Sequence, residues 1–182
     1  MNLLNEQDLI ELIATDEWMM NVLRHASTLE LPDWWICAGF VRSKVWDTLH
    51  SFEVRTPLPD VDVIYFQSDQ VDEENEKRLE GILKKMDPTI PWSVKNQARM
   101  HHVNQVTPYT SSTDGMSKFP ETATAIGVTL DEIGELHLCA PYGVEDLLSM
   151  TIKPTSLFKD SQLFKERLVA KKWSAKWPNV KE

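Results

Sequence analysis

Asp60 and Asp62 are the residues of this chain whose type and spacing point most directly to chemistry. In an extended strand, side chains two residues apart leave from the same face, so both carboxylates can approach one divalent cation. Oxygen ligands of this kind suit Mg²⁺ or Mn²⁺. Paired acids at the start of a strand are also common as solvated surface groups. Here the apolar residues 63–66 follow at once, which places the acids at the mouth of a buried strand and favours a metal site.

A glycine at the start of a helix forms the second candidate feature. Gly39 follows the apolar run 34–38 and precedes a helical pattern, so the backbone can turn tightly there. The N-terminus of such a helix offers free N–H groups and a positive dipole end to a phosphate. Arg42, one turn later, adds a guanidinium that suits phosphate. A purely structural glycine at a helix entry is the alternative interpretation.

The elements that must position these residues follow from hydrophobic periodicity. We expect helices over residues 6–24, 41–52, 69–87, 145–150 and 163–177, and strands over residues 34–38, 61–66, 91–97, 126–128 and 136–140. Residues 98–125 are polar and irregular and predict a mixture of short helix and loop. This order predicts an α/β (α+β) fold in which a small mixed sheet is flanked by helices, and it excludes a helical bundle and a sandwich.

Together these features resemble the nucleotidyltransferase superfamily that includes DNA polymerase beta, and more closely a small bacterial branch of it. The resemblance covers residues 5–180 and is carried by four stretches: Ala38–Asp47, Pro57–Phe66, Trp92–His101 and Pro120–Ala125. It implies a polymerase-beta-like core and a metal-dependent transfer of a nucleotidyl group from a nucleoside triphosphate to an acceptor hydroxyl. It also implies Mg²⁺ or Mn²⁺ as cofactor, with Asp60 and Asp62 as catalytic and metal-binding residues, and Gly39, Phe40 and Arg42 as nucleotide-binding residues.

Two departures from the superfamily pattern leave an alternative open. Phe40 stands where the family has Gly or Ser, and its bulk could restrict the approach of a triphosphate. A third carboxylate is not evident on the neighbouring strand over residues 92–97, and Glu121 is the nearest later candidate. A non-catalytic nucleotide- or partner-binding module is therefore the alternative function, and a hydrolase using the same metal site is a weaker third.

Further polar residues could join the site. Arg99 could contact phosphate or base and His101 a metal or proton, or both could simply form a polar helix start. Asn96 could orient a neighbour or be a satisfied strand amide. Thr122 and Thr124 are expected to be helix-entry residues, and the seven tryptophans are expected to pack in the core rather than to stack on bases.

Composition limits the partners. The net charge is −9, divided between a strongly acidic body and residues 151–182, which hold eight basic and three acidic side chains. An acidic body argues against binding of extended nucleic acid, because phosphate contacts need clustered Lys and Arg. We therefore expect a small-molecule or protein acceptor. We also expect one domain over residues 1–182 and a C-terminal helix over residues 158–177 packed on the body.

Location is predicted from cysteine usage and hydropathy. Cys37 and Cys139 lie in apolar surroundings outside any metal-spaced motif, which favours a reduced, cytoplasmic protein. No apolar run approaches the ~20 residues of a membrane helix, and no signal peptide is visible at the N-terminus.

Overall fold

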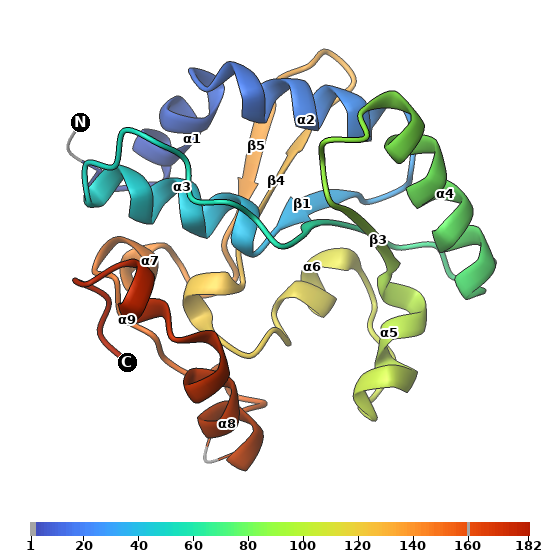
Figure 1. The fold of residues 1–182 in the computed structure, drawn as a ribbon. Helices are drawn as coiled ribbons and strands as arrows, with labels where there is room; N and C mark the ends of the chain where they lie inside the picture. The colour runs from blue at the N-terminus through green and yellow to red at the C-terminus, as the bar shows by residue number, and fades with distance from the viewer. Residues whose placement is uncertain (1–2, 160) are drawn as a thin grey trace.

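A five-stranded mixed sheet forms the centre of the molecule (Figure 1). The structure is a computed structural model, and it describes residues 3–159 and 161–182. The strand order is β3-β2-β1-β4-β5, in which β2 and β3 are parallel and the other neighbouring pairs are antiparallel. The strands are β1 (Trp35–Cys37), β2 (Val61–Tyr65), β3 (Trp92–Asn96), β4 (Gly127–Leu130) and β5 (Leu136–Cys139). The predicted α/β class, with a small mixed sheet flanked by helices, is confirmed.

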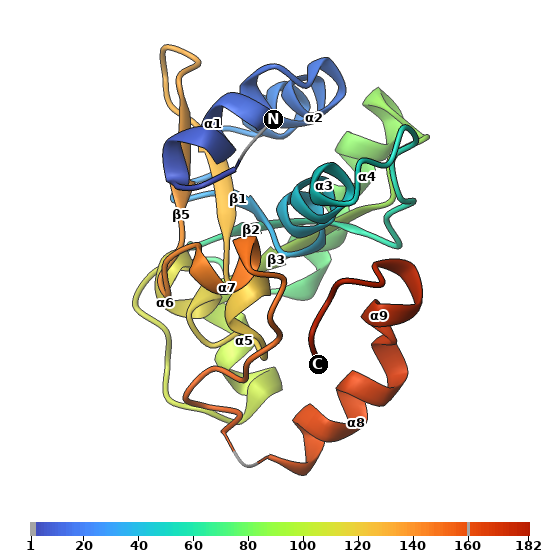
Figure 2. The same cartoon turned by 90° about the vertical axis from the view of Figure 1, so that its left-hand side faces the viewer.

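Four helices cover one face of the sheet and enclose the main core (Figures 1 and 2). They are α1 (Glu6–Ala14), α2 (Glu17–Ser27), α3 (Gly39–Leu49) and α4 (Glu73–Met86). The sheet contributes buried β-branched residues to this core, among them Ile36, Val63 and Val94. Burial of these large apolar side chains, at roughly 1.5–3 kcal/mol each, fixes which face of each strand points inward.

The remaining helices lie on the side of the other sheet face (Figures 1 and 2). They are α5 (Gln97–Asn104), α6 (Ser112–Met116), the 3-10 turn η1 (Thr122–Thr124), α7 (Glu145–Leu148), α8 (Gln162–Lys171) and α9 (Trp173–Lys176). A small apolar cluster of Cys37, Ile64 and Met116 covers part of this face. The predicted mixture of short helix and loop over residues 98–125 is therefore confirmed.

Strand alternation explains why Asp62 faces this second side. Val61, Val63 and Tyr65 point into the main core, so Asp62 and Ile64 must point the other way. The register sets Asp62 opposite Cys37 of β1 and Ser93 of β3. Side chains paired in this way share a face, so the acid stands among the residues of the thinly covered side.

Two predicted helices are each divided in two. The expected helix over residues 6–24 breaks after Ala14, because the Asp16 side chain caps α2 by accepting a hydrogen bond from the Met19 amide at 3.0 Å. The expected C-terminal helix breaks at Lys172, whose φ of 46° lies in the left-handed region. Hence α8 has no buried residue, and α9 and the turn after it supply the buried Trp173 and Trp177.

Candidate functional site

Asp60 and Asp62 lie at the start of β2. Asp60 is exposed and Asp62 is partly buried. Burial raises the pKa of Asp62 to about 6, and the negative charge of Asp60 adds to the rise, while Ser93, Lys171 and Arg42 oppose it. The charge of Asp60 acts on Asp62 because the two residues are two positions apart at the start of the same strand. A divalent cation is the natural counter-ion for such a pair, and hard oxygen ligands fit Mg²⁺ or Mn²⁺.

The N-terminus of α3 approaches the same region. Ala38, the residue before the helix, has a φ of 56° and caps it with no side-chain hydrogen bond. By contrast, Asn5, Asp16 and Asp72 cap their helices through their side chains. The first turn of α3 therefore keeps unpaired N–H groups at a positive dipole end, next to the strand that carries the acids. Such a turn binds anions.

Phe40 does not obstruct this turn. Its side chain is 1% exposed and belongs to the main core, where its ring lies 5.9 Å from that of Trp18. Only its backbone is therefore available to a phosphate. The steric conflict expected from a bulky residue in the glycine turn is absent, because the helix directs the ring to the opposite side.

Arg42 lies in a cluster of three tryptophans. The centre of its guanidinium is 5.3 Å from the ring of Trp46, 5.4 Å from that of Trp173 and 5.9 Å from that of Trp177. Burial lowers its pKa to about 10, although Glu121, Asp60 and Asp62 favour its charged form. Its Nε atom is buried and has no partner among the described residues. Cation–π contacts thus hold a guanidinium that keeps hydrogen-bonding capacity beside the acids.

A hollow of about 210 Å³ opens next to Asp62. It lies on the sheet face opposite the main core, between β2, β3 and the segments that follow them. Its lining contains both apolar and polar residues: Ala38, Asp62, Ile64, Lys95, Gln97, Met100, Phe119, Pro120, Thr124 and Arg167. Asp62, one of the two proposed metal ligands, therefore borders a space large enough to receive part of a small molecule.

Glu121 and Arg167 form an ion pair that sequence reasoning did not find. Glu121 is fully buried, and its carboxylate accepts hydrogen bonds from Arg167 and, at 2.7 Å, from the Thr124 hydroxyl. Glu121 is thus occupied by an arginine rather than free to complete a metal site. Arg167 reaches the hollow from α8, far along the sequence, so no local spacing could have revealed it.

Arg99 lies in a different polar cluster. Its guanidinium donates two hydrogen bonds to the buried Glu76, at 3.0 and 2.8 Å, and Lys95 lies 3.5 Å from the same carboxylate. Arg99 does not line the hollow beside Asp62. His101 stacks against His102, with ring centres 3.8 Å apart. The Asn96 amide nitrogen donates hydrogen bonds to the carbonyls of Gln67 and Gln70, and its oxygen accepts one from the Ala98 amide in the first turn of α5.

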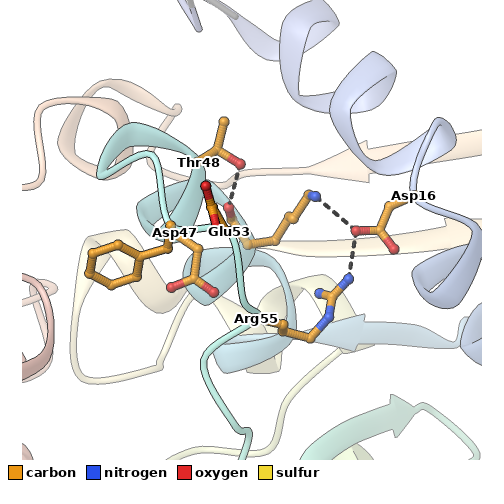
Figure 3. Close-up of a pocket in the computed structure, with 7 residues that line it drawn as sticks. Asp16, Asp47, Thr48, Glu53 and Arg55 are labelled. Atoms are coloured by element: carbon orange, nitrogen blue, oxygen red, sulfur yellow. Dashed lines mark hydrogen bonds and ion pairs between the residues drawn. The ribbon is translucent and has the colours of Figure 1, made fainter.

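A second hollow, of about 240 Å³, lies on the far side of α3 (Figure 3). There Asp16 binds Lys44 at 2.8 Å and Arg55 at 2.6 Å. The guanidinium of Arg55 lies over the ring of Trp18, 4.2 Å from its centre. Asp16, Lys44 and Arg55 satisfy one another, so this cluster fastens α2 to α3. Glu53, which also lines the hollow, makes no ion pair among the described residues.

Within the described part of the chain, one group of three residues has the spacing of a metal site: Asp131, Glu135 and His137 in the β4–β5 hairpin. Asp131 accepts hydrogen bonds from the amides of Ile133 and Glu135, and its other oxygen lies 3.0 Å from His137 Nε2. The hydrogen bonds that Asp131 makes within the hairpin account for the proximity of these three side chains. The cluster is separate from Asp60 and Asp62.

Comparison with known proteins identifies the fold. The sequence profile of a nucleotidyltransferase family matches residues 24–181. The chain belongs to this nucleotidyltransferase family. A protein solved by NMR and described as revealing a CCA-adding enzyme head domain is 37% identical, with a TM-score of 0.85, over 99% of this chain and 97% of that one. The nucleotidyltransferase is thus of the polymerase-beta type, as the motifs predicted.

Longer enzymes share the fold. The complex of a CCA-adding enzyme with ATP has a TM-score of 0.56 at 13% identity, covering 94% of this chain and 42% of that one. The Thermotoga maritima CCA-adding enzyme complexed with tRNA has a TM-score of 0.55 at 13% identity, covering 94% and 40%. The chain thus spans less than half the length of these enzymes. No curated protein matches the sequence.

The structure adds one observation on membranes. None of the helices in residues 3–159 and 161–182 combines the length and the apolar character needed to cross a bilayer.

Proposed function

We propose that this nucleotidyltransferase is a metal-dependent enzyme that transfers a nucleotidyl group from a nucleoside triphosphate to the hydroxyl of a small molecule or protein. The observation that supports the proposal is the register of β1 and β2, which pairs Asp62 with Cys37, two residues before the uncapped first turn of α3. Acids for a cation and N–H groups for phosphates then lie side by side. A divalent cation bound by the two acids would neutralise phosphate charge and orient the reacting oxygens.

The chain's own residues bind and orient the triphosphate. In this proposal the backbone of Gly39 and Phe40 and the guanidinium of Arg42 contact the phosphates. Arg167, whose guanidinium also binds Glu121, adds positive charge from α8. The acceptor oxygen forms a bond to the α-phosphorus, the bond from that phosphorus to the β-bridging oxygen breaks, and pyrophosphate leaves. The proton of the acceptor hydroxyl passes to solvent. Rate enhancement then comes from positioning and charge neutralisation.

In this proposal Arg99 stabilises the structure near the site and does not contact the triphosphate while it binds Glu76. Its guanidinium already binds Glu76 in two places, so a phosphate would have to compete with a buried carboxylate. A nucleotide-binding role for Arg99 requires the Arg99–Glu76 ion pair to open when the triphosphate binds. The variant Arg99→Lys, which keeps the charge, separates this role from simple stabilisation of α5.

One observation favours the alternative, a nucleotide- or partner-binding module without turnover. Glu121, the candidate third acid, is held by Arg167 and Thr124, and neither strand beside β2 carries an acid at the level of Asp62. A site with two acids can hold a cation but gives weaker support to a two-cation mechanism.

The decisive experiment follows radiolabel from an α-³²P nucleoside triphosphate in the presence of Mg²⁺ or Mn²⁺, with measurement of pyrophosphate. The proposal predicts metal-dependent release of pyrophosphate by the wild type and at least a hundredfold loss in Asp62→Asn. Asp69→Asn, the same change at an exposed loop residue, is the matched control and should keep full activity. Nucleotide binding with no pyrophosphate release would favour the binding module, and release of free phosphate would indicate a hydrolase.

A further inference from the structure

The hollow beside Asp62 combines apolar and polar lining residues in a small volume. Ile64, Met100, Phe119 and Pro120 provide an apolar lining, and Ile64 is itself 2% exposed. A volume of about 210 Å³ is small for a ligand pocket, and suits part of a molecule rather than a large substrate. Burial of an aromatic ring against such a lining stabilises a complex without restricting its orientation, so a polar group is needed to select one.

Gln97 supplies that polar group. It is the first residue of α5, its residue is only 3% exposed, and it lines the hollow. Buried side-chain amides are almost always hydrogen-bonded. Yet among the hydrogen bonds of the described residues none is made by the Gln97 side chain, while the neighbouring Asn96 amide is fully engaged. The residue is thus largely buried while its amide opens on the hollow, where a ligand can take up its hydrogen bonds.

Close packing holds the amide in place. A Cβ atom added at Gly115 would lie 2.5 Å from Gln97 Oε1 and 3.1 Å from Gln97 Cγ, so the glycine of α6 makes room for this side chain. Tyr109 lies 3.1 Å from the same point. This close packing limits the positions of the amide before a ligand arrives, which lowers the entropic cost of binding.

We propose that this hollow binds the heterocyclic base of the nucleotide, with the Gln97 amide as the group that recognises its edge. The inference rests on the proposed function, because Asp62 and Arg167, which line the same hollow, are assigned there to the cation and the phosphates. A side-chain amide presents one acceptor and two donors, and it pairs in a bidentate manner with a base edge such as N6 and N7 of adenine. The apolar walls receive the faces of the base.

This arrangement gives the site a means to discriminate among nucleotides. A site that hydrogen-bonds a ligand group rejects analogues that lack it more strongly than an apolar site rejects a change of size. Phosphate contacts at α3 and Arg167 are the same for every nucleoside triphosphate. Base preference must therefore originate from the hollow and Gln97.

The test compares nucleoside triphosphates with inorganic tripolyphosphate, which has the phosphates but no base. Affinities are measured by calorimetry in Mg²⁺ for the wild type and for Gln97→Met, which keeps the length of the side chain and removes its hydrogen bonds. Gln7→Met, the same change at an exposed residue of α1 on the opposite side of the sheet, is the matched control. Met100→Trp, which fills the hollow from a partly exposed position, is a second variant should Gln97→Met fail to fold.

The wild type is expected to bind at least one nucleoside triphosphate at least about tenfold more tightly than tripolyphosphate. Gln97→Met or Met100→Trp should lower the affinity for that nucleotide only by about tenfold, equivalent to ~1.4 kcal/mol. Gln7→Met should change neither affinity. Equal binding of tripolyphosphate and all four nucleotides would overturn base recognition while leaving the proposed function intact. Unchanged nucleotide affinity in folded Gln97→Met and Met100→Trp would overturn it as well. Binding of neither probe by the wild type would overturn both proposals.

Discussion

The carboxylate of Asp62 occupies a position that destabilises the cation-free protein. Burial and the charge of Asp60 raise its pKa to about 6, above the ordinary value of 3.8. The folded state therefore holds the proton more tightly than the unfolded state. Asp62 contributes its full stability below pH 3.8 and loses it as the pH rises through about 6.

Asp62→Asn should abolish metal-dependent nucleotide chemistry and preserve the fold. In EDTA at pH 7.5 its melting temperature should be equal to that of the wild type or up to several degrees higher, because removal of one of two like charges relieves repulsion. A gain of ~1 kcal/mol in the free energy of unfolding corresponds to about 2–4 °C in a chain of this size. The difference should shrink as the pH falls from 7 to 4. Thermal unfolding followed by circular dichroism measures both effects. A melting temperature lower by many degrees would show that Asp62 has a structural role.

Residue spacing alone predicts the candidate groups whose placement depends on local geometry. Asp60 and Asp62 are two residues apart on one strand, and Gly39 follows directly on another, so strand and helix periodicity suffices to place them. Arg167 and Glu121 are 46 residues apart, and Gln97 meets Gly115 through the packing of two short helices. Contacts of that kind depend on the tertiary fold, and nothing in the neighbouring sequence distinguishes these residues.

At the scale of elements, strands were easier to predict than the breaks within helices. Residues 6–24 keep an apolar periodicity through Thr15 and Asp16 because α1 and α2 both bury apolar residues in the same core. The signal for the break was the capping chemistry of Asp16, which an apolar pattern does not contain. At the C-terminus the apolar residues suggested one packed helix. Leu163 and Val169 are instead exposed, while Phe164 and Leu168 pack against the core. Trp173 and Trp177 contact Trp46 of α3.

The link between α2 and α3 gives a pH prediction. Burial raises the pKa of Asp16, but the hydrogen bond from Lys44, the Met19 amide and Arg55 lower it below 3.8 overall. Its stabilising effect is therefore present above pH 3.8 and is lost as the pH falls through the lower folded value.

Asp16→Asn keeps a capping side chain but loses the charge, so it should lower stability at pH 7 by about 1 kcal/mol. Asp16→Ala should lose about 1 kcal/mol more with the cap. Urea unfolding at pH 7 and at pH 3 measures both, and the deficit of Asp16→Asn should be smaller at pH 3 than at pH 7. A deficit independent of pH would contradict the ion-pair explanation.

The C-terminal segment is expected to be part of the folded body. Trp177 Nε1 donates a hydrogen bond to the buried Asp47 at 2.8 Å, and the rings of Trp173 and Trp177 cover Arg42. Truncation after Thr155 would also leave the buried Glu121 without Arg167. The truncated protein should be insoluble or partly unfolded, as judged by gel filtration and near-UV circular dichroism. A soluble truncation with unchanged melting temperature would show that residues 156–182 form an independent arm.

Trp177→Phe refines this prediction with a milder change. The ring stays in the core, but Asp47 loses a charge-assisted hydrogen bond, which should lower the free energy of unfolding by about 1.5–3 kcal/mol. Trp34→Phe, at a partly buried position without a hydrogen bond to a buried acid, is the matched control. Urea unfolding of the two variants measures the loss of this bond together with the altered ring contacts to Trp46 and Arg42.

The charge distribution of the whole molecule decides what kind of acceptor it can approach. The net charge is −9, and the basic surplus is confined to residues 151–182. The helix α8, which extends away from the sheet, carries its lysines on a surface with no buried residue (Figure 2). Nucleic acid approaching the site would meet attraction from one short helix and repulsion from the rest of the chain. Counterion release with so few contacts gives little affinity at physiological salt.

We therefore expect weak binding to extended RNA, even though the fold is shared with an enzyme solved in complex with tRNA. Fluorescence anisotropy with a labelled duplex RNA and a labelled tRNA should give dissociation constants weaker than about 100 µM at 150 mM salt, the weak limit of non-specific binding. Lys165→Glu with Lys172→Glu, both at exposed positions, should reduce any residual binding seen at 20 mM salt. Micromolar binding at 150 mM salt that this double variant abolishes would reverse the argument. The C-terminal segment would then be the surface that presents an RNA acceptor to Asp60 and Asp62.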